Sequence, residues 1–306
     1  MNISDINIFP IKSLKGISVE SAVVEDRGLR YDRRWMLTDG EGRFFTQREF
    51  PRMALIEVGI DDEALYVTAD GFGTLEIAHS PETGDRRPVT IWQSVCDGEI
   101  YGDVVNEWFS DVLGTDCQLV YMPDDSRRSV NPRFDRGNEV VSFADGYPLM
   151  VLSEASLEDL NGRIAEGLLQ DYHPVSSQNT AAATPPKQGG ELFVPLPMNR
   201  FRPNLVVSGT EAYAEDDWRK IRIGDVEFRS TKPCERCVIT TVEQSRGEFD
   251  GKEPLRTLAT YRMAKDVMPD LYESLGLGPT AVLFGQNLIG ESPGSTIVLG
   301  QSVEVI

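Results

Sequence analysis

The stretch Trp35-Met-Leu-Thr-Asp-Gly-Glu-Gly-Arg-Phe-Phe-Thr46 decides the fold class, because it predicts two strands joined by a tight turn. Asp39-Gly40 separates its two extended halves, and Asp-Gly favours a hairpin turn in which both central residues need positive φ. The same dipeptide chemistry recurs at Asp70-Gly71 and, reversed, at Gly224-Asp225. Working outward from these turns, we predict a mainly β chain built from short antiparallel strands.

Few helices interrupt this pattern. Asp103 is predicted to cap a helix whose apolar residues run to Val112, and Ser153 to cap one whose apolar stripe runs to Leu168. A short helix is expected over 255–262, and strands are expected over 117–122, 204–208, 219–223, 226–229, 237–242, 297–299 and 303–306. Many short strands with few helices predict a β-rich α+β fold with two β-barrels.

Residues 170–198 break the periodicity. This segment contains paired serines, an alanine run, Pro185-Pro186 and Gly189-Gly190, with no apolar repeat. Such composition cannot bury enough apolar surface to order a chain. We therefore expect a long, mobile insertion here.

Charge and composition exclude several classes of function. The 306 residues carry a net charge of −19, which repels nucleic acid and anionic membrane surfaces. The charge either serves solubility or adaptation to salt, or favours a partner with a basic face. The sequence has only two histidines, which argues against a Ser-His-Asp hydrolase and against a metal site with several histidine ligands. Four cysteines are too few for a disulfide scaffold, and neither a signal peptide nor a membrane span is apparent. We expect a soluble protein in a reducing cytoplasm.

The most informative motif for function is Lys232-Pro-Cys-Glu-Arg-Cys-Val-Ile-Thr-Thr-Val242. Its Cys234-x-x-Cys237 pair has three interpretations. A zinc site needs a second ligand pair, which the other two cysteines do not supply. A thioredoxin-like site needs a helix after the second cysteine, where we expect a strand. The third interpretation is a pair of structural thiols. The flanking cations Lys232 and Arg236 would favour a thiolate, the form that binds a soft metal.

At this point the chain resembles a known family. The motif above, followed by Lys252-Glu-Pro-Leu and Tyr261-Arg262, is similar to the MOSC domain of the mitochondrial amidoxime-reducing component and the bacterial YcbX-type proteins. The resemblance covers nearly the whole chain, in the family's order, through Phe9-Pro-Ile-Lys-Ser13, Gly16, Gly28-Leu29, Asp32-Arg33, Trp35, Leu152-Ser-Glu-Ala-Ser156, Leu160-Asn161, Phe201-Arg-Pro-Asn204, Ala214-Glu-Asp216, Trp218 and Phe284-Gly-Gln286.

The resemblance implies a two-domain fold and a cofactor. Residues 1–121 would form an MOSC N-terminal β-barrel domain, with residues 1–33 also contributing to the cofactor pocket, and residues 122–306 the MOSC domain. The family binds molybdenum cofactor, a metal held by a pterin dithiolene that ends in a phosphate. Cys237 would be the metal ligand and the catalytic residue, and the implied cofactor-binding residues are Lys12, Ser13, Arg33, Arg202, Asn204, Cys234, Glu235 and Arg236.

These residue types suit such a cofactor. A phosphate binds guanidinium forks, ammonium groups and hydroxyls, which Lys12, Ser13 and Arg33 supply. Arg202 and Asn204 lie two apart on an expected extended segment, so both would face the pterin's polar edge. Glu235 departs from the small polar residue usual in the family, and would place a carboxylate beside the metal, either opposing a thiolate or carrying a proton.

The implied reaction is a two-electron removal of oxygen from small N-hydroxylated compounds such as amidoximes and hydroxylamines. No C-x₄-C-x₂-C run is present, so we predict no intrinsic iron–sulfur cluster and a separate electron donor, which could be a ferredoxin, a flavoprotein reductase or a b-type cytochrome. Two other functions remain open: a sulfur carrier using a Cys237 persulfide, and a non-catalytic protein that binds or delivers the cofactor.

Overall fold

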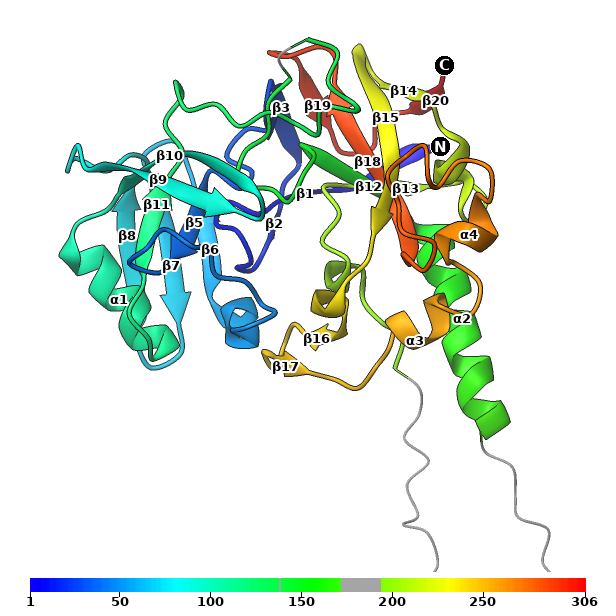
Figure 1. The fold of residues 1–306 in the computed structure, drawn as a ribbon, viewed down its shortest axis with the longest axis horizontal. Helices are drawn as coiled ribbons and strands as arrows, with labels where there is room; N and C mark the ends of the chain where they lie inside the picture. Colours follow the sequence, from blue (N-terminus) through cyan, green and yellow to red (C-terminus); the bar gives the residue numbers. More distant parts are fainter. Residues whose placement is uncertain (138, 172–193) are drawn as a thin grey trace, which may run out of the picture.

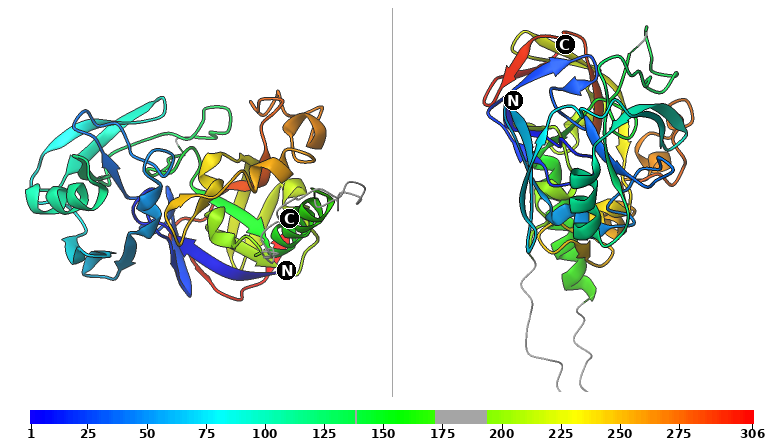
Figure 2. Two further views of the ribbon diagram at one scale, coloured as in Figure 1. Left: turned by 90° about the horizontal axis from the view of Figure 1, so that it is seen from below. Right: turned by 90° about the vertical axis from the view of Figure 1, so that its left-hand side faces the viewer.

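The computed structural model describes residues 1–137, 139–171 and 194–306, and most of the insertion predicted over 170–198 lies outside them. The described chain forms two lobes side by side (Figures 1 and 2). The smaller lobe contains the strands from Trp35 to Tyr121, and the larger lobe contains the strands before and after them. Short strands dominate both lobes, which confirms the predicted β-rich fold class. No helix in the described ranges has the length and apolar character needed to cross a membrane.

The smaller lobe consists of two sheets, one α-helix and the 3₁₀ helix Pro51–Leu55. A four-stranded antiparallel sheet has the order β5 (Trp35–Thr38), β11 (Gln118–Tyr121), β10 (Ser94–Ile100), β9 (Arg86–Ile91). The second sheet is a three-stranded antiparallel meander formed by β6 (Glu57–Ile60), β7 (Ala64–Ala69) and β8 (Gly73–Ala78). The turn predicted at Asp39-Gly40 is present, since the backbone N–H of Phe45 donates to the Leu37 carbonyl at 2.8 Å.

Helix α1 (Asp103–Leu113) begins one residue earlier than its predicted cap implies. Gly102 occupies the N-cap position, and Asp103 is the first helical residue, where its carboxylate faces the positive end of the helix dipole. Phe109 and Val112 are buried against the sheet as predicted. A left-handed Gly114 ends the helix.

The larger lobe is built on an eight-stranded sheet. Its order is β2 (Ile17–Ser18), β1 (Asn2–Ile8), β13 (Leu205–Ser208), β12 (Leu149–Ser153), β18 (Leu283–Gly290), β15 (Val226–Glu235), β14 (Lys220–Ile223), β20 (Val303–Val305). A three-stranded sheet of β19 (Thr296–Val298), β3 (Ser21–Glu25) and β4 (Gly28–Leu29) lies beside it, and β16 (Val242–Glu243) pairs with β17 (Glu248–Phe249).

The N-terminal strand belongs to the larger lobe. Strand β1 lies inside the eight-stranded sheet, antiparallel to β13, so the first residues of the chain pair with residues two hundred positions away. Both chain ends lie at this lobe (Figure 1), and the N–H of Val303 donates to the Met1 carbonyl at 2.9 Å. A domain boundary between residues 121 and 122 stays a prediction.

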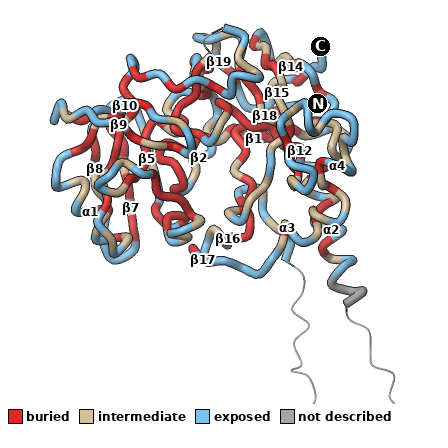
Figure 3. The backbone as a smooth tube through the Cα atoms, in the orientation of Figure 1, coloured by how far each residue is buried: buried red, intermediate tan, exposed pale blue. Residues whose placement is uncertain are grey.

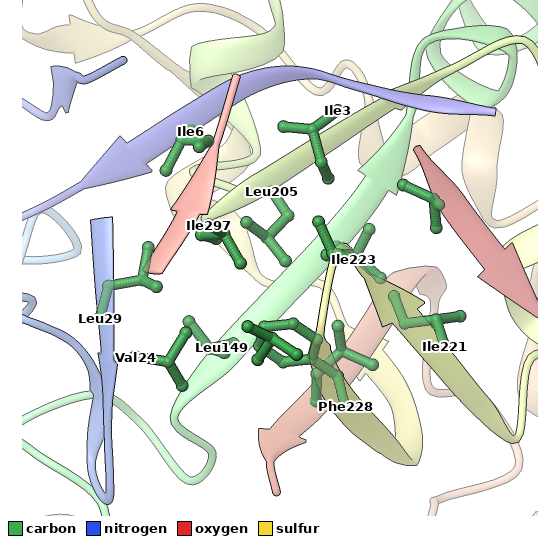
Figure 4. Packing of buried hydrophobic residues seen from close by; sticks show 14 of the residues in the cluster. Ile3, Ile6, Val24, Leu29, Leu149, Leu205, Ile221, Ile223, Phe228 and Ile297 are labelled. Atoms are coloured by element: carbon green, nitrogen blue, oxygen red, sulfur yellow. The ribbon is translucent and has the colours of Figure 1, made fainter. Parts of the chain in front are cut away.

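The larger lobe has a continuous apolar core. Side chains from the sheet and from β3, β4 and β19 converge on one interior (Figure 4), and buried residues follow the strands of both lobes (Figure 3). Ile6, Leu205 and Phe228 are fully buried within it. Burying one such side chain contributes about 1.5–3 kcal/mol, which holds the strands of this lobe in register.

The described part of this lobe has three α-helices, α2 (Glu154–Asp171), α3 (Leu255–Leu258) and α4 (Ala264–Val267), and the 3₁₀ helices Met198–Arg200, Ala214–Asp217 and Val238–Thr241. The predicted cap of α2 is confirmed, because Oγ of Ser153 accepts a hydrogen bond from the N–H of Ser156 at 3.1 Å. Leu160 and Ile164 are buried as the apolar stripe predicts.

The strand predicted over 237–242 is wrong. A 3₁₀ helix over Val238–Thr241 follows Cys237 instead. Two threonine hydroxyls explain it, because Oγ1 of Thr240 donates to the Cys237 carbonyl at 2.9 Å and Oγ1 of Thr241 to the Val238 carbonyl at 2.8 Å. Such local side-chain to backbone bonds compete with sheet pairing despite the β-branched composition. The reason given against a thioredoxin-like site, a strand directly after Cys237, is therefore wrong; the segment is instead a 3₁₀ helix of four residues that leads into β16.

Candidate functional site

A pocket of about 150 Å³, open to solvent, is lined by the predicted site residues. Each of the nine contributes to its lining: Lys12, Ser13, Arg33, Arg202, Asn204, Cys234, Glu235, Arg236 and Cys237. They come from four separate parts of the chain, namely the loop after β1, the β4–β5 connection, the segment before β13 and the end of β15. The structure thus brings the whole predicted set together, while the ligand that each residue would bind stays a prediction.

Three of these residues have unusual backbone conformations. Ser13, Arg33 and Arg202 have φ values of 68°, 49° and 54°, in the left-handed region that non-glycine residues rarely adopt. Strain of this kind persists only where the surrounding structure enforces it, and it clusters at functional sites. The backbone geometry therefore supports a site function independently of the side chains.

The ring of Phe9 supports two of the arginines. The guanidinium carbons of Arg33 and Arg202 lie 4.3 Å and 4.2 Å from its centroid, within cation–π distance. Nη1 of Arg33 also donates to Oδ2 of Asp32 at 2.6 Å and to Oδ1 of Asn204 at 2.9 Å. Stacking and hydrogen bonds together fix Arg33 toward the pocket.

The expected pairing of Arg202 and Asn204 on one extended face is wrong. The positive φ of Arg202 interrupts the extended segment before β13. Asn204 is 1% exposed, and its amide bonds Arg33, the Met150 N–H at 3.3 Å and the Asn7 carbonyl at 3.1 Å. Asn204 positions Arg33, and Arg202 remains as the group available to a ligand. Burial, and next the Arg33 charge, lower the pKa of Arg202 to about 9, so it is charged at neutral pH.

Lys12 and Asp145 form an ion pair at the pocket wall. Nζ of Lys12 donates to Oδ1 of Asp145 and, at 2.9 Å, to the Phe143 carbonyl. Burial lowers the pKa of Lys12 to about 8, against the opposing effect of Asp145. Burial alone would raise the pKa of Asp145, but the Lys12 ammonium outweighs it and holds that pKa well below its usual range.

Cys237 faces an arginine that the sequence analysis missed. Nη2 of Arg48 lies 3.0 Å from Sγ of Cys237 and 3.8 Å from Oδ2 of Asp145. The indole of Trp92 stacks on the Arg48 guanidinium at 4.7 Å and donates from Nε1 to Asp145 at 3.2 Å. Arg48 and Trp92 belong to the smaller lobe, so both lobes build the surroundings of the thiol. No local motif marks either residue.

Cys234 has a different environment. Nη1 of Arg236 donates to its Sγ at 3.0 Å, and Nη2 of Arg236 donates to the Phe201 carbonyl at 2.8 Å. Burial raises the pKa of Cys234 in spite of that arginine. The expectation that flanking cations favour a thiolate is therefore wrong for Cys234, and the hydrogen bonds found for the Arg236 guanidinium among the described residues go to Met150, Cys234 and Phe201. Both thiols are free.

Glu235 lies at the exposed side of the cysteine loop. Its carboxylate accepts from Nζ of Lys232 at 2.5 Å, so the second flanking cation is also directed away from Cys237. The carboxylate remains part of the pocket lining. Its charge is offset by this partner, which weakens the expected opposition to a neighbouring thiolate.

Positive charge dominates the pocket of this acidic protein. Six cations line it against two carboxylates: Lys12, Arg33, Arg48, Arg200, Arg202 and Arg236 against Asp145 and Glu235. Four buried nitrogen positions of these arginines lack a hydrogen-bond partner among the described residues, namely Nη1 of Arg48, Nε and Nη1 of Arg200, and Nε of Arg236. Buried donors of this kind normally have partners, so the pocket is built for an anion.

A metal held here would need ligands from outside the protein. Within the described ranges, no three His, Cys, Asp or Glu side chains gather as a metal site. Cys237 offers one thiol at the edge of the cationic pocket. This arrangement suits a metal that arrives already bound by an anionic cofactor.

Comparison with known protein families identifies the class. Residues 1–116 match the MOSC N-terminal beta barrel domain, and residues 138–304 match the MOSC domain. The chain belongs to the family of proteins that combine these two domains, as its motifs predicted.

Individual relatives extend over nearly the whole chain. Mitochondrial amidoxime-reducing component 1 of Mus musculus is 35% identical over 98% of this chain and 80% of its own length. Mitochondrial amidoxime reducing component 2 of Bos taurus is 32% identical over 89% and 75%. Molybdenum cofactor sulfurase of Oryza sativa subsp. japonica is 32% identical over 87% of this chain but only 31% of its own length. Of these three relatives, the sulfurase has molybdenum cofactor in its name.

Proposed function

We propose that this protein binds molybdenum cofactor and reduces small N-hydroxylated compounds. The observation that carries the proposal is the single pocket that combines six cations with the Cys237 thiol. It is supported by the two amidoxime-reducing relatives, each above 30% identity.

The residues present fit such a group. Its phosphate would bind among Lys12, Ser13, Arg33 and Arg202, where two guanidinium groups stacked on one ring face the pocket. The unpartnered donors of Arg48 and Arg236 would bond further polar atoms of the pterin. Cys237 would be the protein ligand of the metal. When bound, the cofactor supplies a two-electron redox centre, and the protein supplies orientation and electrostatics.

The overall reaction balances with two electrons and two protons. An N–OH group becomes N–H, the N–O bond breaks, and the oxygen leaves as water. The electrons would come from a separate donor, such as a ferredoxin, a flavoprotein reductase or a b-type cytochrome. Arg48 holds the Cys237 side chain through its 3.0 Å contact, and Trp92 holds Arg48. The protein thereby fixes the thiol before any ligand arrives.

The test combines metal analysis with turnover. The purified full chain is expected to contain molybdenum and pterin in equal amounts, and to reduce benzamidoxime with a chemical donor. Cys237→Ala should lose both the molybdenum and the turnover of benzamidoxime. Cys96→Ala removes a buried thiol of the smaller lobe and serves as the matched control that keeps both. Metal content and turnover surviving in Cys237→Ala would overturn the assignment of the ligand.

Sulfur transfer is the second candidate, favoured by the sulfurase relative. It requires a persulfide on Cys237 in a protein without molybdenum, which mass spectrometry of the intact chain detects. Tight binding of the cofactor with no turnover under any donor would instead favour a carrier.

A further inference from the structure

A second groove lies behind the strands that carry the cysteine loop. Pro233 on β15 and Gln286 on β18 are paired in register, and both line this groove. Their neighbours Cys234 and Asn287 line the cationic pocket. Because successive residues of a strand face opposite sides of a sheet, the two strands form a wall shared by both hollows.

Two residues that line the groove each have a buried oxygen acceptor without a partner. Gln286 is 4% exposed, and its Oε1 accepts no hydrogen bond from the part of the chain that the structure describes. Oδ1 of Asp216 is equally without a partner there, although Oδ2 accepts from Nη2 of Arg262 at 2.6 Å. Leaving buried acceptors unbonded costs roughly 1–3 kcal/mol each, so their presence together indicates a donor-rich ligand.

The rest of the lining selects for a cation with an apolar body. Glu211, Asp217 and Asp270 add three carboxylates, against the single cation Arg219. Apolar side chains complete the wall, namely Val267, Met268 and Leu271. A bare metal ion is disfavoured, since the described residues hold no cluster of three potential metal ligands.

We propose that this groove binds a guanidinium or amidinium group. A planar group of this kind presents several N–H donors in one plane, and so bonds a carboxylate oxygen and an amide oxygen together. Either a free small molecule or an arginine side chain of a peptide carries this chemistry. The inference does not depend on the function proposed for the cationic pocket.

Calorimetric titration of the full chain with benzamidine tests the proposal. Saturable binding at one site is expected. Gln286→Leu and Asp216→Asn should each weaken it at least about tenfold, while Gln286→Glu, which keeps an acceptor, should bind at least as tightly as the native chain. Asp111→Asn, on an exposed position of α1 that lines neither hollow, is the control that leaves binding unchanged, and thermal unfolding of every variant verifies its folding.

Two results would overturn the proposal: no saturable binding by the folded native chain, or equal affinity in Gln286→Leu and Asp216→Asn. A parallel titration with the peptide Gly-Arg-Gly distinguishes the sources. Tighter binding of the peptide assigns the groove to an arginine side chain, and tighter binding of benzamidine assigns it to a free molecule.

Discussion

At the scale of single residues, Lys12 gives the pocket a dependence on pH. Burial lowers its pKa to about 8, so its ammonium is charged below that pH and neutral above it. Sulfate, whose own charge is constant, should therefore bind with constant affinity below about pH 8 and at least about tenfold more weakly above it, since a hydrogen bond from a charged group contributes roughly 1.5–3 kcal/mol. Calorimetry across this range measures the change. Lys12→Arg, which stays charged, should remove the loss that begins near pH 8 and leave only the loss expected above about pH 9 from Arg202, and a flat profile for the native chain contradicts the prediction.

Gly16 supports the arginines indirectly. A Cβ added there would lie 2.4 Å from Cε1 of the buried Phe9, whose ring carries Arg33 and Arg202. Gly16→Ala should lower the free energy of unfolding by about 1–3 kcal/mol through overpacking, and weaken sulfate binding as well. Urea unfolding and calorimetry measure the two effects. Gly40→Ala meets no atom within 4 Å and is the matched control; identical sulfate affinity in both variants would refute the role of the ring.

At the scale of elements, the turn after Cys237 should matter more than its sequence implies. Thr240→Val removes the hydroxyl that donates to the Cys237 carbonyl, and valine also favours extended backbone. We expect a lower molybdenum content after reconstitution, with a loss of unfolding free energy of no more than about 1.5 kcal/mol. Thr260→Val loses the same type of bond, from Oγ1 to the Thr257 carbonyl, on an exposed residue. Equal metal content in the two variants would show that the turn is not needed.

The helices and strands that the structure confirms are those marked in the sequence by a periodic apolar pattern or by a turn dipeptide. The hairpins at Asp39-Gly40 and Asp70-Gly71 and the apolar stripe of α2 depend on local chemistry that the sequence displays. It failed over 237–242, because hydroxyl groups outweighed β-propensity. The scattered site residues were found through family motifs and not through any local pattern. Arg48 escaped detection because only the approach of the two lobes brings it to Cys237.

At the scale of the whole molecule, the larger lobe needs the N-terminal strand β1 to complete its eight-stranded sheet, although most of that sheet comes from residues after 148. A chain of residues 122–306 would lack β1, which lies between β2 and β13 and buries Ile3, Ile6 and Ile8. Three isoleucines contribute roughly 5–9 kcal/mol, comparable with the whole stability of a typical domain. We therefore predict that residues 122–306 alone do not fold, although the MOSC domain match lies inside them.

Circular dichroism during heating tests this dependence. The fragment 122–306 should show no cooperative transition, whereas its coexpression with residues 1–121 should restore one, because β1 and β3 can then pair with β13 and β19 across the break. A cooperative transition of the isolated fragment would mean that the larger lobe is autonomous. In that case Lys12, Ser13 and Arg33 would belong to a separable module, and the pocket would assemble only after both parts had folded.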